Sequence, residues 1–141
     1  MRMLLEPGGK GNAMQYACLI YLEEAKFAAM SQAERNGFVN ASLDCDEELR
    51  RSSHLVMAQA LKTPPHAVSL RAWNGRVSVT DGPFAETKEH LGGFVLIEAR
   101  DLYDAIKVAG RMPLARVGTI EVRPFEELDY IDTPAAGEAG R

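Results

Sequence analysis

The chain has 141 residues, which is enough for one domain with a core of its own. Its hydrophobic fraction of 46% and charged fraction of 26% are ordinary for a soluble globular protein. The formal charge of -4 argues against a nucleic-acid-binding surface, which needs clustered Lys and Arg. No apolar run is long enough to cross a bilayer. Cys18 and Cys45 are expected to be buried free thiols, so we expect a cytoplasmic protein. From the charge and the lack of a long apolar run we expect it to bind neither nucleic acid nor membrane.

The sequence divides into three predicted parts. Residues 1–13 contain a glycine-rich stretch without helical or strand periodicity and are expected to form a flexible leader. Residues 14–125 are expected to form a single α+β domain. Residues 126–141 are predicted to be a flexible C-terminal tail.

The first half of the domain predicts a strand, a helical region and a second strand. Residues 15–22 are apolar almost throughout, which is typical of a strand covered on both faces. Ser31 and Glu34 have capping-box spacing, so a helix is predicted to begin there. We expect Asn36 and Gly37 to weaken this helix before a second helical piece that ends near residue 51. Residues 55–61 are predicted to form a strand that ends before Pro64.

The pair Asn74-Gly75 lies between two alternating runs and predicts a β-hairpin with a type I′ turn. This turn would place Ala72 opposite Val77, Leu70 opposite Val79 and Val68 opposite Asp81. By this alternation Asp81 continues the apolar face of the hairpin. A carboxylate in that position is either bonded to amides of the following turn or directed into a cavity.

The second half predicts a strand at residues 94–97, a helix capped by Asp101 that stops at Gly110, and a last strand at residues 117–122. The order β-α-β, hairpin, β-α-β predicts a ferredoxin-like split βαβ fold with an inserted β-hairpin. Both helices of that fold lie on one face of the sheet, yet the strands are apolar on both sides. A twofold partner is the simplest cover for the second face, so we expect a homodimer.

Several runs resemble the DGPF-domain branch of the YCII-related proteins. They are TDGPFAETKE at residues 80–89, LGGF at 91–94, IEA at 97–99, Asp101-Leu102 and EVRP at 121–124. The resemblance covers about residues 14–124 and implies a dimeric α+β barrel with a cleft near the first of these runs. It also implies a small cytoplasmic bacterial protein. Some family members are encoded beside or fused to extracytoplasmic-function sigma factors, so a sigma factor is an implied partner.

The wider superfamily also implies an enzymatic alternative. Some of its members are thought to be lyase-like enzymes with a His–Asp pair whose histidine lies on the first helix. In this chain residues 31–51 contain no histidine, and His54 follows them. The alternative function is therefore a lyase or isomerase type of enzyme in which Asp81 is the acid or base and His54 its partner.

The candidate ligand-binding residues surround the first of the family-like runs: Asp81, Phe84, Glu86, Lys88, Glu89 and Arg123. Phe84 either lines a pocket or pins the loop to the core. Lys88 either binds an anionic ligand or pairs with Glu86 and Glu89, and Arg123 either binds a carboxylate or pairs with these same two residues. No spacing predicts a metal site, and no cofactor is expected. The favoured function is binding of a small polar or anionic metabolite in a cleft beside this loop.

Overall fold

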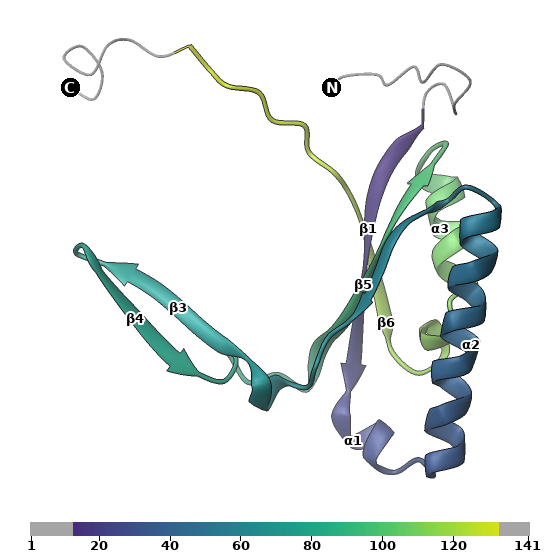
Figure 1. Cartoon of the computed structure of the whole chain (residues 1–141), viewed down its shortest axis with the longest axis horizontal. Helices are drawn as coiled ribbons and strands as arrows, with labels where there is room; N and C mark the ends of the chain where they lie inside the picture. Colours follow the sequence, from purple (N-terminus) through teal and green to yellow (C-terminus); the bar gives the residue numbers. More distant parts are fainter. Residues whose placement is uncertain (1–12, 133–141) are drawn as a thin grey trace.

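The structure is a computed structural model that describes residues 13–132. The chain forms a four-stranded sheet with helices on one face and a separate two-stranded hairpin that projects away from it (Figure 1). Residues 1–12 and 133–141, which hold most of the predicted leader and part of the predicted tail, lie outside the described residues.

The sheet is antiparallel and has the order β2-β5-β1-β6. Its strands are β1 (Met14–Glu23), β2 (Leu55–Ala60), β5 (Glu89–Ala99) and β6 (Thr119–Pro124). This α+β arrangement is consistent with a ferredoxin-like fold. Strand β5 is longer than the predicted 94–97, because His90 and Leu91 also pair with β1. The last strand begins two residues later than predicted, after a 3-10 turn at Pro113–Arg116.

Three helices accompany the sheet: α1 (Glu24–Ala28), α2 (Gln32–Arg51) and α3 (Leu102–Gly110). The predicted capping box is confirmed, since the Ser31 hydroxyl accepts the Glu34 amide and the Glu34 carboxylate accepts the Ser31 amide. The predicted interruption at Asn36 and Gly37 is wrong: α2 continues through both residues as one helix. Within residues 13–132, none of the helices is long and apolar enough to cross a membrane.

Gly37 lies in the interior of α2, and a Cβ added there would meet nothing within 4 Å. We expect Gly37→Ala to raise the free energy of unfolding by about 0.5 to 1 kcal/mol, since alanine loses less backbone entropy in a helix. Urea titration followed by circular dichroism measures this. The matched control is Gly93→Ala, which should destabilise because its Cβ would lie 2.8 Å from the Gln59 carbonyl oxygen. A loss of stability in Gly37→Ala would contradict the expectation.

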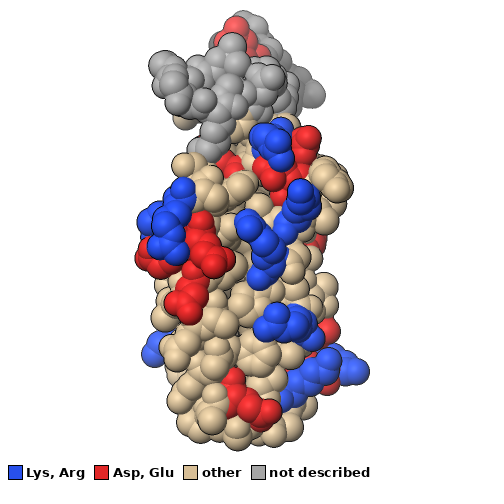
Figure 2. Space-filling model, turned by 90° about the vertical axis from the view of Figure 1, so that its right-hand side faces the viewer, with Lys and Arg blue, Asp and Glu red and all other residues tan. Residues whose placement is uncertain are grey.

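The core lies between the helices and one face of the sheet. It is built from alternate residues of β1 and β5 and the inner faces of α2 and α3, chiefly Tyr16, Cys18, Ile20, Cys45, Leu49, Val95, Ile97, Ala99, Ala105, Val108, Ala109 and Met112. Both cysteines are buried and free, as predicted, and burial raises the pKa of Cys18 to about 11. The outer surface of the helix layer carries acidic and basic side chains side by side (Figure 2), which is typical of a solvated face.

No described element covers the opposite face of the sheet (Figure 1). The strand register places there the alternate residues Ala17, Leu19, Phe94 and Leu96, all half-buried. Polar side chains lie among them: Gln15 opposite Glu98, and Glu121 and Arg123 on the neighbouring strand. We call this surface the open face. The open face carries more apolar side chains than a solvent-exposed sheet face usually does.

The hairpin consists of β3 (Val68–Trp73) and β4 (Arg76–Asp81), and its two strands form a sheet of their own. Its register has the three opposing pairs that the Asn74-Gly75 turn predicts. The two turn residues have φ angles of 50° and 75°, as a type I′ turn requires. Apart from the half-buried Ser69, every residue of β3 and β4 is exposed. The hairpin therefore has no core within the described protomer.

Candidate functional site

Hydrogen bonds hold both ends of the loop between β4 and β5, residues 82–88. The Gly82 amide donates to the Ala67 carbonyl and the Ser69 hydroxyl donates to the Gly82 carbonyl, each at 2.7 Å. At the other end the Thr87 hydroxyl donates to the Glu89 carbonyl. Gly82 has a φ of 95°, a conformation that disfavours any residue with a Cβ. We call this loop, together with the residue on either side of it, the site loop (residues 81–89).

The side chains at the start of the site loop point away from the protomer's core. Asp81 continues the apolar face of the hairpin as its alternation predicts, but it is exposed. Its carboxylate accepts no hydrogen bond from the described residues, so the alternative in which it holds the turn amides has no support. Phe84 is 83% exposed. The interpretation of Phe84 as a core aromatic that pins the loop is therefore wrong for the protomer.

The charged side chains at the end of the site loop have no ionic partners among residues 13–132. Glu86 and Lys88 are exposed and Glu89 is half-buried, and the predicted ion pairs among these three residues are absent from the described part of the chain. Arg123 does not pair with Glu86 or Glu89 as one alternative predicted. It donates through Nε and Nη2 to Glu121 on its own strand, at 3.2 and 2.9 Å.

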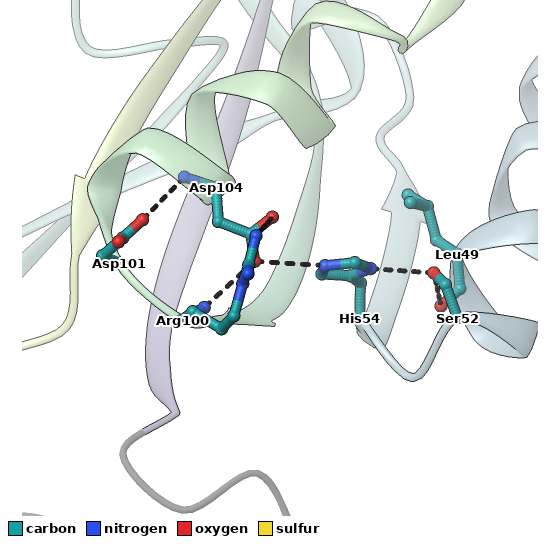
Figure 3. Close-up of polar contacts among 6 residues, drawn as sticks. All are labelled: Leu49, Ser52, His54, Arg100, Asp101 and Asp104. Carbon is teal, nitrogen blue, oxygen red and sulfur yellow. Dashed lines mark hydrogen bonds and ion pairs between the residues drawn. The ribbon is translucent and has the colours of Figure 1, made fainter.

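A second polar cluster links the end of α2 to the start of α3 (Figure 3). His54 Nε2 lies 3.3 Å from Asp104 Oδ2, and His54 Nδ1 lies 2.8 Å from the Ser52 hydroxyl. Asp104 also accepts the Arg100 amide at 3.0 Å, and its own amide donates to Asp101 at 2.8 Å. Asp104 is 7% exposed, which makes it the buried carboxylate of this cluster. We call these residues the His54 cluster.

Charge and hydrogen bonding set the protonation of the His54 cluster. Burial alone would raise the pKa of Asp104, but hydrogen bonds from the Arg100 backbone and side chain and from His54 outweigh it and lower the pKa. A carboxylate at Nε2 requires that nitrogen to carry a proton. In the neutral imidazole Nδ1 is then a hydrogen-bond acceptor, and the single proton of the Ser52 hydroxyl is donated either to it or to the Leu49 carbonyl. Burial, with Asp101 and Asp104 nearby, raises the pKa of the Tyr16 phenol.

The geometry of the His54 cluster does not support nucleophilic catalysis by Ser52. The three turn amides that could stabilise an oxyanion already donate to carbonyls of α2: Ser52 to Glu48, Ser53 to Arg50 and His54 to Leu49. The cluster instead joins the α2–β2 turn to α3. The sequence predicts His54 as a candidate residue but does not predict Asp104 as its partner. The Glu98 amide donates to the His54 carbonyl at 2.8 Å, so the end of β5 brings the first turn of α3 to the α2–β2 turn, a contact between segments far apart in the sequence.

The protomer does not bring His54 and Asp81 together. His54 precedes β2 at the end beside α2, whereas Asp81 lies in the hairpin that begins beyond the opposite end of β2 (Figure 1). The predicted acid–base pair of Asp81 and His54 therefore does not form within one protomer. The histidine has Asp104 as its carboxylate partner instead.

A small cavity of about 30 Å³ lies between α2, the sheet and the turn after α3. Ser42, Cys45, Asp46 and Met112 contribute to its lining, and burial raises the pKa of the Asp46 carboxyl. A volume of this size holds about one water molecule, so this cavity does not fit a metabolite. Among residues 13–132, no group of three or more His, Cys, Asp and Glu side chains is placed to hold a metal ion.

Comparison with known proteins identifies similarity over almost the whole described region. The family description "YCII-related domain" matches residues 14–129. An uncharacterised protein of Rhizobium meliloti (strain 1021), R00369, is 34% identical over 114 residues. That alignment covers 79% of this chain and 92% of the Rhizobium protein.

Proposed function

This chain belongs to the YCII-related family, and from this premise we propose that it is a homodimer that binds a small polar molecule at the site loop. The run at residues 80–89 leads us to place it in the DGPF-domain branch. The observation that carries the proposal is the construction of the site loop: hydrogen bonds hold both of its ends, while its charged side chains make no ion pair with residues 13–132.

A loop of this kind is suited to binding because its conformation is set before a ligand arrives. The hydrogen bonds of Gly82, Ser69 and Thr87 hold the backbone, so little conformational entropy is lost when a ligand is bound. Binding residues commonly lie on such loops, positioned by a rigid scaffold. Exposed ion pairs contribute only about 0 to 1 kcal/mol to stability. A contribution to the stability of the fold is therefore a weak explanation for so many charged side chains in the site loop.

The charges of the site loop favour a ligand that carries both signs. Lys88 supplies an ammonium group for a carboxylate or phosphate, and it makes no ion pair with the described residues. Asp81 and Glu86 supply carboxylates that accept hydrogen bonds from an amine or a hydroxyl group. Arg123 is already bonded to Glu121, so Lys88 is the cation that we assign to the anionic group of the ligand.

The dimer is part of the proposal because one protomer leaves the site loop open to water. Phe84 and Lys88 are exposed, and charge interactions with a small ligand are weak in bulk water. The open face of the sheet and the apolar face of the hairpin both require cover. A second copy that packs on these surfaces would bury them and enclose the loop.

The test is a thermal-shift screen with three sets of small molecules: carboxylates alone, amines alone, and compounds that carry both groups. We expect the third set to raise the melting temperature most. Lys88→Ala should weaken the binding of the best compound roughly 10- to 100-fold, since a hydrogen bond to a charged group contributes about 1.5 to 3 kcal/mol. Isothermal titration calorimetry measures the change in affinity.

The matched control is Lys107→Ala on α3, a lysine that lies over the Tyr103 ring and far from the site loop in sequence. This variant should bind with unchanged affinity. Full binding by Lys88→Ala would contradict the assignment of Lys88. A monomeric mass for the wild-type protein in analytical ultracentrifugation would contradict the dimer.

A further inference from the structure

The hairpin leaves an apolar surface without cover in the protomer. Val68, Leu70, Val77 and Val79 lie on one face of β3 and β4 and are 61 to 64% exposed. A two-stranded hairpin in water is marginally stable unless another strand or helix packs on it. Each of its strands also has one edge that pairs with no other described strand. Such an edge is a template for an added strand.

The segment after β6 is a second apolar element without cover. Residues 125–132 have no helix or strand, and Leu128, Tyr130 and Ile131 are each more than 80% exposed. The segment starts as a continuation of the sheet, since the Phe125 amide donates to the Gln15 carbonyl at 3.0 Å. We call it the tail segment.

The tail segment and the hairpin carry complementary groups. In an extended chain Leu128 and Tyr130 share one face with Glu126 and Asp132, and Asp129 lies on the other face with Phe125, Glu127 and Ile131. The hairpin has one apolar face, while Arg71 and Arg76 lie on its other face. The tail segment carries four acidic residues and no basic one, Glu126, Glu127, Asp129 and Asp132. A strand added at a hairpin edge would therefore place Leu128 and Tyr130 beside the apolar face of the hairpin and Asp129 on the face of the two arginines.

We propose that the tail segment of one copy adds as a strand to the β3–β4 hairpin of a second copy. Both elements project on the side of the sheet opposite α2 and α3 (Figure 1), which is the side with the open face. The hairpin and the tail segment leave the four-stranded sheet at different places and lie apart within one copy. A second copy that packs on the open face would lie between the hairpin and the tail segment. The inference rests on the proposed homodimer but not on ligand binding.

Disulfide cross-linking tests the pairing directly. Val79→Cys is placed on the hairpin of one protein and Leu128→Cys on the tail segment of another that carries a larger affinity tag. The native cysteines are buried, and the two new positions are exposed. After mixing and mild oxidation we expect a mixed dimer of the two chains. The matched control replaces Val79→Cys with Glu47→Cys on the outer surface of α2, which should give no mixed dimer.

Trp73 provides a second readout, because it is the single tryptophan of the chain and lies beside the hairpin turn, 71% exposed in the protomer. Leu128→Ser/Tyr130→Ser should raise the dissociation constant of the dimer roughly tenfold or more, given the apolar area that two such side chains bury. It should also make Trp73 more accessible to iodide quenching. Glu24→Ser, an exposed change on α1, is the control and should alter neither quantity.

The outcomes separate this inference from the proposed function. If the wild-type protein is dimeric, the Val79→Cys and Leu128→Cys chains give no mixed dimer, and the double serine variant leaves the quenching of Trp73 unchanged, the tail–hairpin pairing is overturned and the ligand site is unaffected. A chain that carries both cysteines and forms the disulfide only within a monomer would also overturn the pairing between copies. A monomeric wild-type protein would overturn the dimer itself. Loss of ligand binding in Lys88→Ala changes none of these readouts.

Discussion

Replacing Asp104 by alanine is expected to lower the free energy of unfolding by about 3 kcal/mol. The substitution leaves the Arg100 amide and His54 without the carboxylate that they contact, and an unpaired polar group in a buried position costs about 1 to 3 kcal/mol. It also detaches the α2–β2 turn from α3. Urea denaturation followed by circular dichroism measures the loss. Asp101→Ala is the control and should cost about 1 kcal/mol, since Asp101 caps the helix with one bond at an exposed position.

The pH dependence of the stability of Asp104→Asn, compared with that of the wild type, tests whether the charge of Asp104 is the source of the stabilisation. Because the pKa of Asp104 is lowered in the folded state, its ionised form stabilises the fold above the ordinary value of 3.8. That contribution is lost as the pH falls through the lowered pKa. The stability difference between wild type and Asp104→Asn should therefore stay constant from neutral pH to about pH 5 and narrow below about pH 4. A difference that stays constant to pH 3 would contradict the assignment.

Leu49→Ala is expected to destabilise the protein by about 2 to 5 kcal/mol. Leu49 is 1% exposed and packs in the core from the last turn of α2, so its truncation removes buried methyl groups and leaves a cavity. The backbone carbonyl of Leu49 also accepts the His54 amide at 2.8 Å and the Ser52 hydroxyl at 3.2 Å. A shift of this turn should therefore disturb the His54 cluster as well as the core. Chemical denaturation monitored in the far ultraviolet gives the free energy.

Leu43 provides the matched control on the same helix. It is 58% exposed, so Leu43→Ala removes few contacts and should change the stability by less than about 0.5 kcal/mol. Equal losses for the two leucines would mean that α2 does not pack with the face that the structure describes. Proton NMR of the His54 ring in Leu49→Ala would show whether the cluster moves together with the core.

Local chemistry in the sequence was enough to predict most of the elements. The Asn74-Gly75 turn requires positive φ at both residues, so it predicted the register of β3 and β4. The spacing of Ser31 and Glu34 predicted the start of α2 in the same way. Asn36 and Gly37 misled the prediction because their low helix propensity costs only about 1 kcal/mol. The packing of the later part of the helix, with Cys45 and Leu49 in the core, outweighs such a cost.

The candidate site was harder to predict because its contacts are not local. The alternation of the hairpin correctly placed Asp81 on the apolar face, but parity does not tell whether that face is covered. The pairing of His54 with Asp104 joins residues 50 positions apart, and it depends on how the two βαβ units meet. Arg123 pairs along its own strand with Glu121 rather than with the site loop. Side chains two residues apart on a strand share a face, so the pairing of Arg123 with Glu121 is a local one.

The Gly82 amide that bonds to the Ala67 carbonyl makes the base of the hairpin and the start of the site loop one structural unit. In the proposed homodimer, a molecule that binds residues 82–88 more tightly when the second copy encloses the loop would therefore also favour the dimer. Thermodynamic reciprocity then requires that association of the subunits strengthens ligand affinity by the same factor. At protein concentrations below the dissociation constant of the dimer, the fraction of loops that hold a ligand would fall as the protein is diluted. A saturating concentration of ligand would restore the dimer.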